Sequence, residues 1–418
     1  MDYHKNGLKY ISCISLLALS VGSFATAWNN PNSTPKSGST RYSAFTGPPK
    51  TLDPARSYSS DEAVFTAQIY EPPLQYHLLK RPYALVPLTL TDLPTVTFYN
   101  KKNQKLPAKT PPNDVAYTVY DLYLKPGIMY QPHPAFVQQS QDLTDIHKLT
   151  DFKKTGSREL TAHDYVYQIK RLASPRTQSP ILSLMAKHIV GLDDYSKLLS
   201  VENGNLPKGA WLDLRKHPIE GVKAISPYHY QIKIKGVYPQ FKYWLAMPFF
   251  APIPWEADQF YSRPGMKARN ITFDWQPIGT GAYMLSKNDP NKEMILERNP
   301  NYHVELYPHK GEAGDQQHGY LVHSGKTLPL TDRYVFSLDK ENIPRWNKFL
   351  QGYYDVSGIG ADSFDQAVKI DKNGDPILTE SMKKQGIKLD VQVSPGIFYT
   401  GFNMLDKIVG GHSEKQRK

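Results

Sequence analysis

Histidines and carboxylates that could bind a metal ion are concentrated in one stretch of the second half of the chain. They are His303, Glu305, His309, Glu312, Asp315, His318 and His323. A protease-type zinc site needs two histidines at i and i+4 around a glutamate, and no pair in this stretch has that spacing. The stretch is also rich in glycine and proline, which favours a loop. We therefore interpret it as a polar surface loop and predict no metal site.

Two other motifs resemble ligand sites but lack residues that those sites need. Residues 371–375 begin like a calcium loop, but Pro376 stands where that loop needs a glycine and Met382 where it needs a glutamate. Gly279-Thr280-Gly281 is too short to cradle a phosphate, and no lysine follows it. The sequence contains no Gly-x-Ser-x-Gly motif. We therefore expect a solvated turn at 371–375, no catalytic residues and no cofactor, so the protein is not predicted to be an enzyme.

The first predicted helix lies between Ser59 and Pro72. Ser59 and Ser60 can cap its first turn, and Phe65 and Ile69 share one of its faces. Proline lacks a backbone N–H and ends the helix at Pro72.

A second helix is predicted to begin at Thr161, which forms a capping box with Asp164. Ile169 and Leu172 lie on its apolar face, and Pro175 ends it.

Alternating residues predict strands in several places. Residues 115–123 read as a strand that leads into a tight turn at 124–128, and 221–236 read as a hairpin that turns near Pro227. Three apolar residues of this hairpin, Tyr230, Ile232 and Ile234, are expected on one face.

Other segments complete the prediction. We expect a proline-rich surface segment at 247–255 and a turn at 277–283, where Gly279 and Gly281 allow an approach that side chains would obstruct. A short amphipathic helix is predicted at 346–354 and a strand at 397–403. Together these elements indicate a loop-rich α/β protein.

The N-terminus is typical of an exported protein. Lys5 and Lys9 precede an apolar run at 11–24, and Ala25-Thr26-Ala27 forms a small-residue cleavage site. The alternative is a membrane anchor, but the run is shorter than the roughly 20 residues that a span needs. Residues 1–27 are therefore predicted to be a signal peptide, followed by a flexible leader at 28–41.

Cleavage there would remove Cys13, the single cysteine of the chain. The mature protein would then have no disulfide, no thiol catalysis and no thiolate metal ligand. We predict a periplasmic or extracellular location.

The net charge of +11, from 50 Lys+Arg and 39 Asp+Glu, could indicate a nucleic-acid partner. The basic residues are instead scattered as short pairs such as Lys101-Lys102 and Lys383-Lys384. Because no basic stripe forms along one helix, we predict no nucleic-acid binding.

Several of these segments, in their order, resemble extracellular solute-binding protein family 5, which serves peptide importers. The residues that carry the resemblance are Leu52-Asp53-Pro54, Tyr70-Glu71-Pro72, Leu124-Lys125-Pro126-Gly127, Thr161-Ala162-His163-Asp164, Ile278-Gly279-Thr280-Gly281-Ala282-Tyr283, Asn299-Pro300-Asn301-Tyr302 and Phe402-Asn403. Each motif alone is common, and their order behind a signal peptide is informative. The resemblance extends from about Leu52 to Asn403.

The resemblance implies a periplasmic binding protein-like fold (type II, cluster C), with two lobes and an inserted subdomain. It places lobe I at 42–76 and 219–297, the inserted subdomain at 77–218, and lobe II at 298–418. Family members continue well beyond the Phe-Asn strand, so lobe II is expected to be incomplete and the reading frame truncated or split. The stretch from His133 to Glu159 is a further departure, and we interpret it as a surface insertion.

The resemblance also implies a role for specific residues. Tyr58, Ser59 and Ser60 match the family segment that pairs with a peptide backbone, and their hydroxyls and amides suit that contact. Capping of the following helix by the two serines is the alternative. Tyr399 and Asn403 are further candidates for the ligand cleft, with a role in the core as the alternative.

The implied function is to bind extended oligopeptides in the periplasm and deliver them to the permease of an ABC importer, with the binding protein acting as a monomer. Two alternatives stay open at this point. The same fold could bind a non-peptide solute such as a metal chelate, haem or a sugar, because a fold does not determine its ligand. The chain could also be a nonfunctional truncated fragment, since an incomplete lobe exposes apolar surface and strand edges.

Overall fold

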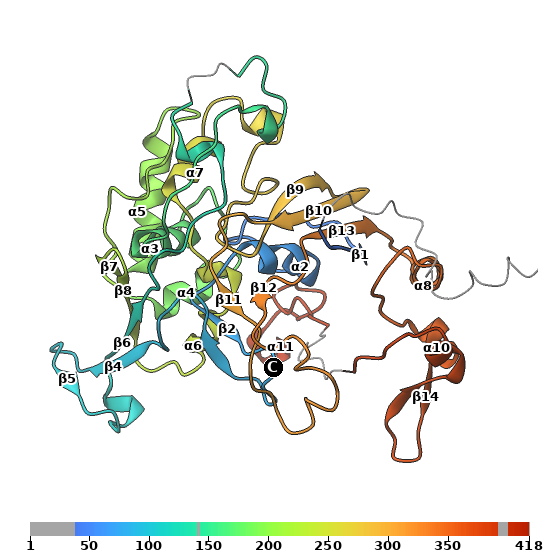
Figure 1. The fold of residues 1–418 in the computed structure, drawn as a ribbon. Coiled ribbons are helices and arrows are strands. Elements are labelled where there is room, and N and C mark those ends of the chain that lie inside the picture. Colours follow the sequence, from blue (N-terminus) through green and yellow to red (C-terminus); the bar gives the residue numbers. More distant parts are fainter. Residues whose placement is uncertain (1–37, 140–142, 392–399, 418) are drawn as a thin grey trace, which may run out of the picture. The chain divides into compact units, whose positions relative to one another are not determined.

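The computed structural model describes residues 38–139, 143–391 and 400–417, which form two compact units (Figure 1). Unit 1 ends at Ser357 and unit 2 begins at Gly358. The predicted signal peptide at 1–27 lies outside the described residues. Within the described residues, no helix is both long and apolar enough to cross a membrane.

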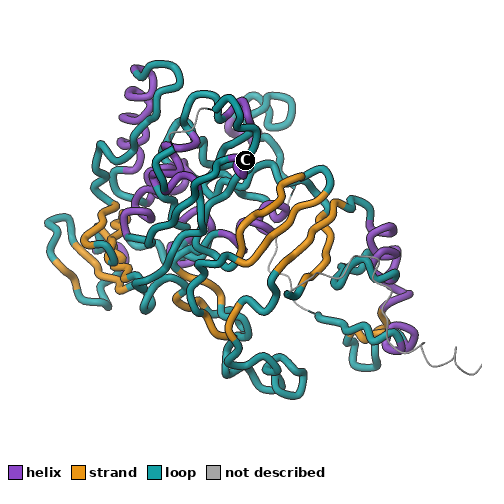
Figure 2. Tube along the Cα trace, turned by 45° about the horizontal axis from the view of Figure 1, so that its top comes forward, coloured by secondary structure: helices purple, strands orange, loops and turns teal. Residues whose placement is uncertain are grey.

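The first sheet of unit 1 has four strands in the order β1-β13-β10-β9 (Figure 2). They are β1 (Thr40–Phe45), β13 (Arg333–Leu338), β10 (Glu293–Arg298) and β9 (Tyr283–Asp289). The β1–β13 pair is parallel and the other pairs are antiparallel. Helix α2 (Ser60–Ile69) packs on this sheet, because the Phe65 ring lies 5.7 Å from that of Phe45 and 5.3 Å from that of Phe336. The sheet thus supports the helix that follows the candidate ligand residues.

The second sheet of unit 1 has five antiparallel strands in the order β5-β4-β6-β8-β7. They are β5 (Lys105–Leu106), β4 (Thr95–Tyr99), β6 (Tyr117–Tyr123), β8 (His229–Lys235) and β7 (Val222–Ser226). The predicted face of the hairpin is confirmed, since Tyr230, Ile232 and Ile234 are all buried. Helix α3 (Ala162–Leu172) covers this face, where Tyr165 stacks on Tyr230 at 5.0 Å.

Shorter elements complete both units. Unit 1 also contains β2 (Leu74–Tyr76), β3 (Leu85–Pro87), η1 (Pro112–Asp114), η2 (Pro134–Phe136), η3 (Leu149–Asp151), α4 (Leu182–His188), α5 (Leu192–Asn205), α6 (Phe241–Trp244), η4 (Pro248–Phe250), α7 (Trp255–Tyr261), η5 (Lys267–Arg269), β11 (Glu305–Leu306), β12 (Thr327–Leu328) and α8 (Asn342–Leu350). Unit 2 contains η6 (Ala361–Ser363), α9 (Phe364–Ala367), β14 (Val368–Ile370), β15 (Pro376–Leu378), α10 (Glu380–Lys384) and α11 (Glu414–Arg417).

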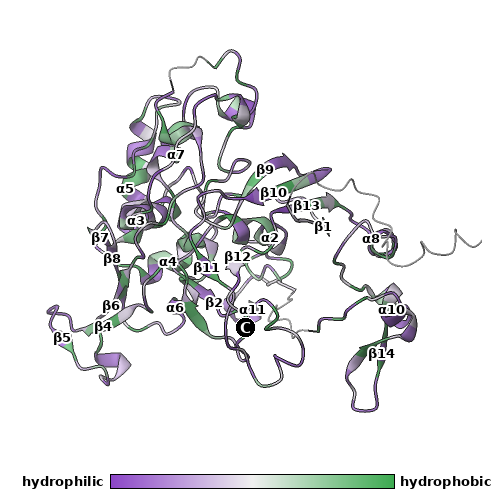
Figure 3. Ribbon diagram, in the orientation of Figure 1, coloured by the Kyte–Doolittle hydropathy of each residue, from purple (hydrophilic) through white to green (hydrophobic). Residues whose placement is uncertain are grey.

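A continuous apolar core joins the two sheets of unit 1. It extends from Phe45 to Phe336 and includes residues of α2, α3 and both sheets. Figure 3, a ribbon coloured by hydropathy, shows both green and purple residues along these elements, as expected for half-buried strands and amphipathic helices.

Several predictions are confirmed locally. The two capped helices form as α2 and α3, and the turn before Ile128 contains Gly127 at φ +82°. The stretch at 371–375 is a largely exposed turn between β14 and β15.

The proline-rich segment at 247–255 was predicted to lie on the surface, and this is wrong. Phe249, Phe250 and Ile253 are buried. The reason is that this segment folds inward as η4, where Phe250 contacts Phe241 with ring centroids 5.7 Å apart.

Other boundaries also differ. The helix predicted at 346–354 is α8, which begins at Asn342 and ends at Leu350. The leader predicted to extend to residue 41 ends earlier, because Thr40 and Arg41 already pair with β13. Of the strand predicted at 397–403, residues 397–399 lie outside the described residues, and 400–403 form no strand.

The insertion at 133–159 is only partly on the surface. His133, Ile146 and Phe152 are buried, and the Phe152 ring lies 5.1 Å from that of Phe260 in α7. Burial lowers the pKa of His133 to about 3, so its imidazole is neutral in the folded protein. The insertion therefore contributes to the core.

The predicted domain division stays a proposal. The strand pairing bears on its boundaries: β8, from the segment assigned to lobe I, pairs with β6 of the proposed inserted subdomain. Likewise β13, from the segment assigned to lobe II, pairs with β1 near the start of lobe I.

Candidate ligand-binding site

The candidate residues Tyr58, Ser59 and Ser60 lie together at the N-terminal end of α2, and all three are exposed. The Tyr58 side chain is 67% exposed, although the loop before it is almost entirely buried from Thr51 to Ala55. A well-anchored loop thus presents three hydroxyl groups to solvent.

Glu62, in the first turn of α2, organises this end of the loop. Its carboxylate accepts hydrogen bonds from the amides of Tyr58 (2.8 Å), Ser59 (3.0 Å) and, more distantly, Lys50 (3.3 Å). Ser59 is the N-cap residue of the helix. The amides of Tyr58 and Ser59 are therefore already engaged, which leaves the side-chain hydroxyls as the groups of these two residues best placed to reach a ligand.

An aromatic cluster lies beside Tyr58. Its ring is 6.3 Å from that of Phe249, which in turn is 6.4 Å from that of Trp244. The Trp244 indole donates a hydrogen bond to the Tyr238 hydroxyl at 3.3 Å. The sequence reasoning missed this cluster because it placed residues 247–255 on the surface, although the aromatic content of that segment was a signal.

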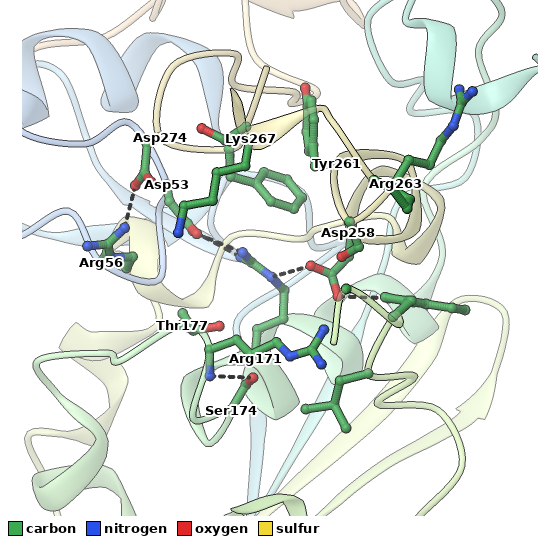
Figure 4. A pocket seen from close by; sticks show the side chains of 18 of the residues that line it. Asp53, Arg56, Arg171, Ser174, Thr177, Asp258, Tyr261, Arg263, Lys267 and Asp274 are labelled. Atoms are coloured by element: carbon green, nitrogen blue, oxygen red, sulfur yellow. Dashed lines mark hydrogen bonds and ion pairs between the residues drawn. The ribbon is translucent and has the colours of Figure 1, made fainter. Parts of the chain in front are cut away.

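A buried ion pair anchors the loop from below (Figure 4). The Arg171 guanidinium donates two hydrogen bonds to Asp53, at 2.9 and 2.7 Å, and both side chains are at most 5% exposed. Arg171 also lies 4.3 Å from the centre of the Phe273 ring. Burial lowers the pKa of Arg171, but the neighbouring charge of Asp53 outweighs it, and the net pKa is raised. The Leu-Asp-Pro motif thus holds the loop on α3.

The other end of α2 is closed by the glycine turn. The Gly281 amide donates to the Ile69 carbonyl at 2.9 Å. A Cβ on Gly279 would lie 1.9 Å from that same carbonyl oxygen, and one on Gly281 would lie 2.6 Å from it. This confirms that the two glycines permit an approach that side chains would obstruct.

A second pair, between the buried Glu71 and the half-buried His303, lies just after α2. The Glu71 carboxylate lies 2.7 Å from Nε2 of His303, and the two side chains are 4% and 13% exposed. Burial lowers the pKa of His303, but the hydrogen bond and charge of Glu71 outweigh it, so the pKa is raised. The other carboxylate oxygen of Glu71 is buried and has no hydrogen-bond partner among the described residues.

The histidine-rich stretch is therefore not simply a surface loop. His303 is half-buried in its pair with Glu71, and Asp315 is buried and bound to Arg81. Residues 316–320 are exposed as predicted. In the described part of the chain, no group of three or more His, Cys, Asp or Glu side chains is arranged to hold a metal ion.

The remaining candidates belong to the C-terminal part. Tyr399 lies outside the described residues, and Asn403 is an exposed residue of unit 2. The Asn403 side-chain oxygen accepts a hydrogen bond from the Leu405 amide at 3.3 Å, and the residue is not in a core. The structure thus groups Tyr58, Ser59 and Ser60 in unit 1 and places Asn403 in unit 2.

Comparison with known proteins identifies the family. Residues 155–410 match the family described as bacterial extracellular solute-binding proteins, family 5 Middle. The periplasmic oligopeptide-binding protein OppA of Salmonella typhimurium is 27% identical over 197 residues, covering 46% of this chain and 32% of its own length. The nickel-binding periplasmic protein of Escherichia coli is 33% identical over 102 residues, covering 23% of this chain and 17% of its own length.

The fold is similar to that of solved structures. The murein tripeptide binding protein MppA of Escherichia coli matches with a TM-score of 0.50 and 15% sequence identity, covering 79% of this chain and 48% of the other. This confirms a mixed α/β, periplasmic binding protein-like fold. The chain spans about a third of the length of OppA and about half of that of MppA. Since the family match covers more than half of its residues, the chain belongs to the bacterial extracellular solute-binding proteins of family 5.

Proposed function

We propose that this protein binds extended oligopeptides in the periplasm, leaves them chemically unchanged, and delivers them to the permease of an ABC importer. The observation that carries the proposal is the 197-residue similarity to OppA, a periplasmic oligopeptide-binding protein. The protein would act as a monomer, and a hinge motion would close its lobes on the peptide.

The end of α2 supports this proposal physically. The hydroxyls of Tyr58, Ser59 and Ser60 are exposed on a loop that is anchored by a buried ion pair, so little order has to be created on binding. Hydroxyl groups can donate hydrogen bonds to a peptide main chain and accept them from it, whatever side chains the peptide carries. The exposed Tyr58 ring lies against the buried ring of Phe249 and can pack against apolar parts of a peptide.

The first experiment is a thermal melt of the predicted mature chain, from Trp28 to Lys418, with and without a mixed pool of di- to pentapeptides. A cooperative transition that shifts upward with peptide is expected, because a ligand that binds only the folded state stabilises it. No shift at any peptide concentration would contradict the proposal. Peptides recovered unchanged after incubation are expected as well, and their cleavage would indicate a hydrolase.

Two matched variants locate the contact. Tyr58→Ala is expected to weaken peptide binding roughly tenfold, in line with the loss of about 1.4 kcal/mol from one aromatic contact. Tyr123→Ala removes another half-exposed tyrosine, from β6, and is expected to leave binding unchanged. If the two variants bind peptide with equal affinity, the peptide site does not lie at the N-terminal end of α2.

A second candidate is a non-peptide solute such as a metal chelate, and the similarity to the nickel-binding protein favours it. Native mass spectrometry of the protein purified without added ligand separates the two. A heterogeneous set of peptide masses supports the first proposal, whereas a single metal-containing adduct supports the second.

A further inference from the structure

The hairpin of β4 and β5, at one edge of the five-stranded sheet, carries four lysines close together in the chain. They are Lys101, Lys102, Lys105 and Lys109. All four are exposed, and no acidic residue occurs between Asp92 and Asp114. Among the described residues, none of the four ammonium groups has an ion-pair or hydrogen-bond partner. Figure 1 shows the two strands extending from the rest of unit 1, so the hairpin presents a concentrated positive charge to solvent.

The pairing of the strands continues this charge across one face of the sheet. Lys105 lies opposite Tyr99, Tyr99 lies opposite Tyr117, and Tyr117 lies opposite Lys235. Directly opposed residues of antiparallel strands point to the same face, so these four side chains form one row. Because neighbouring strands are about 4.8 Å apart, the row extends over about 14 Å.

This row lies on the face of the sheet that points away from the core. Successive residues of a strand point to opposite faces, and Ile234, the residue before Lys235, is buried in the core. Lys105 and Lys235 are exposed, while Tyr99 and Tyr117 are half-buried. The row is therefore accessible to a partner.

The carboxylates on or beside this face are mostly engaged. Glu220 binds the Lys233 ammonium at 2.9 Å, which neutralises that lysine. Asp121 accepts a hydrogen bond from the Gln231 amide at 2.7 Å. Asp114, just after the hairpin, is exposed and offsets one charge. The hairpin lysines together with Lys235 still leave a clear excess of positive charge.

The polar groups of the row can reach a partner without breaking an ion pair. The Lys235 ammonium lies 3.4 Å from the Ala186 carbonyl oxygen, which is at the long limit for a hydrogen bond. The hydroxyls of Tyr99 and Tyr117 make no hydrogen bond within the part of the chain that the structure describes.

We propose that this basic face, made of the four hairpin lysines, Lys235 and the side chains of Tyr99 and Tyr117, docks on the anionic headgroups of a lipid bilayer. Charge complementarity carries the choice, because lysines near a membrane surface are attracted to anionic lipids. Tyrosine is enriched at membrane–water interfaces, where its ring meets apolar groups and its hydroxyl meets water.

The shape of the basic face also fits a lipid surface. Its lysines are spread along a projecting hairpin and across the sheet, so they suit many phosphate groups on an extended surface and not one small anion. Docking there would hold a binding protein close to a membrane-embedded permease. The inference does not depend on peptide binding, since no residue of α2 belongs to the basic face.

The test is co-sedimentation of the chain from Trp28 to Lys418 with vesicles of phosphatidylcholine, alone or with about one-third phosphatidylglycerol. This chain keeps every described residue and lacks the apolar run at 11–24, which could insert into any vesicle. We expect saturable binding to the anionic vesicles, weakened by high salt because salt screens exposed charges. Equal binding to both vesicles, or binding to neither, would overturn the proposal. Binding to heparin without binding to the anionic vesicles would also overturn it and would indicate a soluble polyanion as the partner.

Variants assign the binding to the hairpin. Changing its four lysines together, as Lys101→Gln, Lys102→Gln, Lys105→Gln and Lys109→Gln, is expected to weaken binding to anionic vesicles about a hundredfold or more, since each lysine near such a surface contributes about fivefold. The matched control removes the same charge from exposed lysines elsewhere in unit 1, as Lys153→Gln, Lys154→Gln, Lys208→Gln and Lys292→Gln, and is expected to keep the parent affinity.

Two further measurements make the comparison decisive. The Tm of each variant verifies that it folds. Peptide affinity should be the same in both variants, so the outcome for lipid binding is independent of the proposed peptide function. Unchanged vesicle binding in the hairpin variant, or an equal loss in the control, would overturn the assignment to the basic face.

Discussion

The two ends of α2 are built in opposite ways. The N-terminal end presents Tyr58, Ser59 and Ser60 to solvent above the buried Asp53–Arg171 pair. The C-terminal end is enclosed by the glycine turn and by the Glu71–His303 pair. One end is open for contact while the other is closed, although a buried carboxylate and a cation hold both.

The two pairs also differ in their response to pH. A guanidinium stays charged at any pH at which the protein is folded. An imidazole can lose its proton near neutral pH. The contribution of the Asp53–Arg171 pair to stability should therefore not change with pH, whereas that of the Glu71–His303 pair should.

The largest effect is expected from Arg171→Met. It leaves the Asp53 carboxylate buried without its partner, which costs about 3–5 kcal/mol of unfolding free energy. Urea unfolding followed by circular dichroism measures it. The double variant Arg171→Met with Asp53→Leu should recover part of the loss, and a double variant no more stable than the single one would show that the pair is not the anchor.

Gly279→Ala tests the closed end. The added Cβ would meet the Ile69 carbonyl oxygen at 1.9 Å, so the turn and helix must separate, at a cost of about 3 kcal/mol. Gly204→Ala is the matched control, since nothing lies within 4 Å of its Cβ and alanine favours helix α5. Equal Tm values for these two variants would refute the close approach.

The pH dependence distinguishes the two pairs. Because the pKa of His303 is raised on folding, its pair with Glu71 stabilises the protein fully below the unfolded pKa of about 6.5 and is lost as pH rises through the folded value. His303→Gln should therefore cost about 1.5 kcal/mol in acid and less in alkali.

The quantity to measure is the difference in unfolding free energy between the parent and His303→Gln at each pH, because His133 changes the stability of both proteins in the opposite direction. With its pKa lowered to about 3, His133 makes the protein less stable as pH falls below about 6.5. A difference between parent and variant that does not change with pH would show that folding does not shift the pKa of His303.

The smallest effect separates capping from ligand contact. Ser59→Ala removes the N-cap residue of α2 and should lower the unfolding free energy by about 1 kcal/mol. Ser60→Ala, one residue inside the helix, should stay within about 0.5 kcal/mol. A loss of peptide affinity in Ser60→Ala would then reflect a lost ligand contact and not a loss of stability. If Ser60→Ala were strongly destabilising, the assignment of the N-cap to Ser59 would be contradicted.

The local elements could be predicted from residues that lie close together along the chain. Ser59 and Thr161 marked the starts of α2 and α3, because a capping residue acts within one turn of its own helix. The alternation of Tyr230, Ile232 and Ile234 predicted the buried face of β8 in the same way. The order of motifs was also sufficient for the family.

The contacts between residues far apart in the chain could not be predicted in this way and are known from the fold alone. Asp53 pairs with a residue 118 positions away, and Glu71 with one 232 positions away. The burial of Phe249 likewise depends on how separate segments pack. Composition and periodicity report only on neighbours along the chain, whereas burial and charge pairing arise from contacts between segments that the fold brings together.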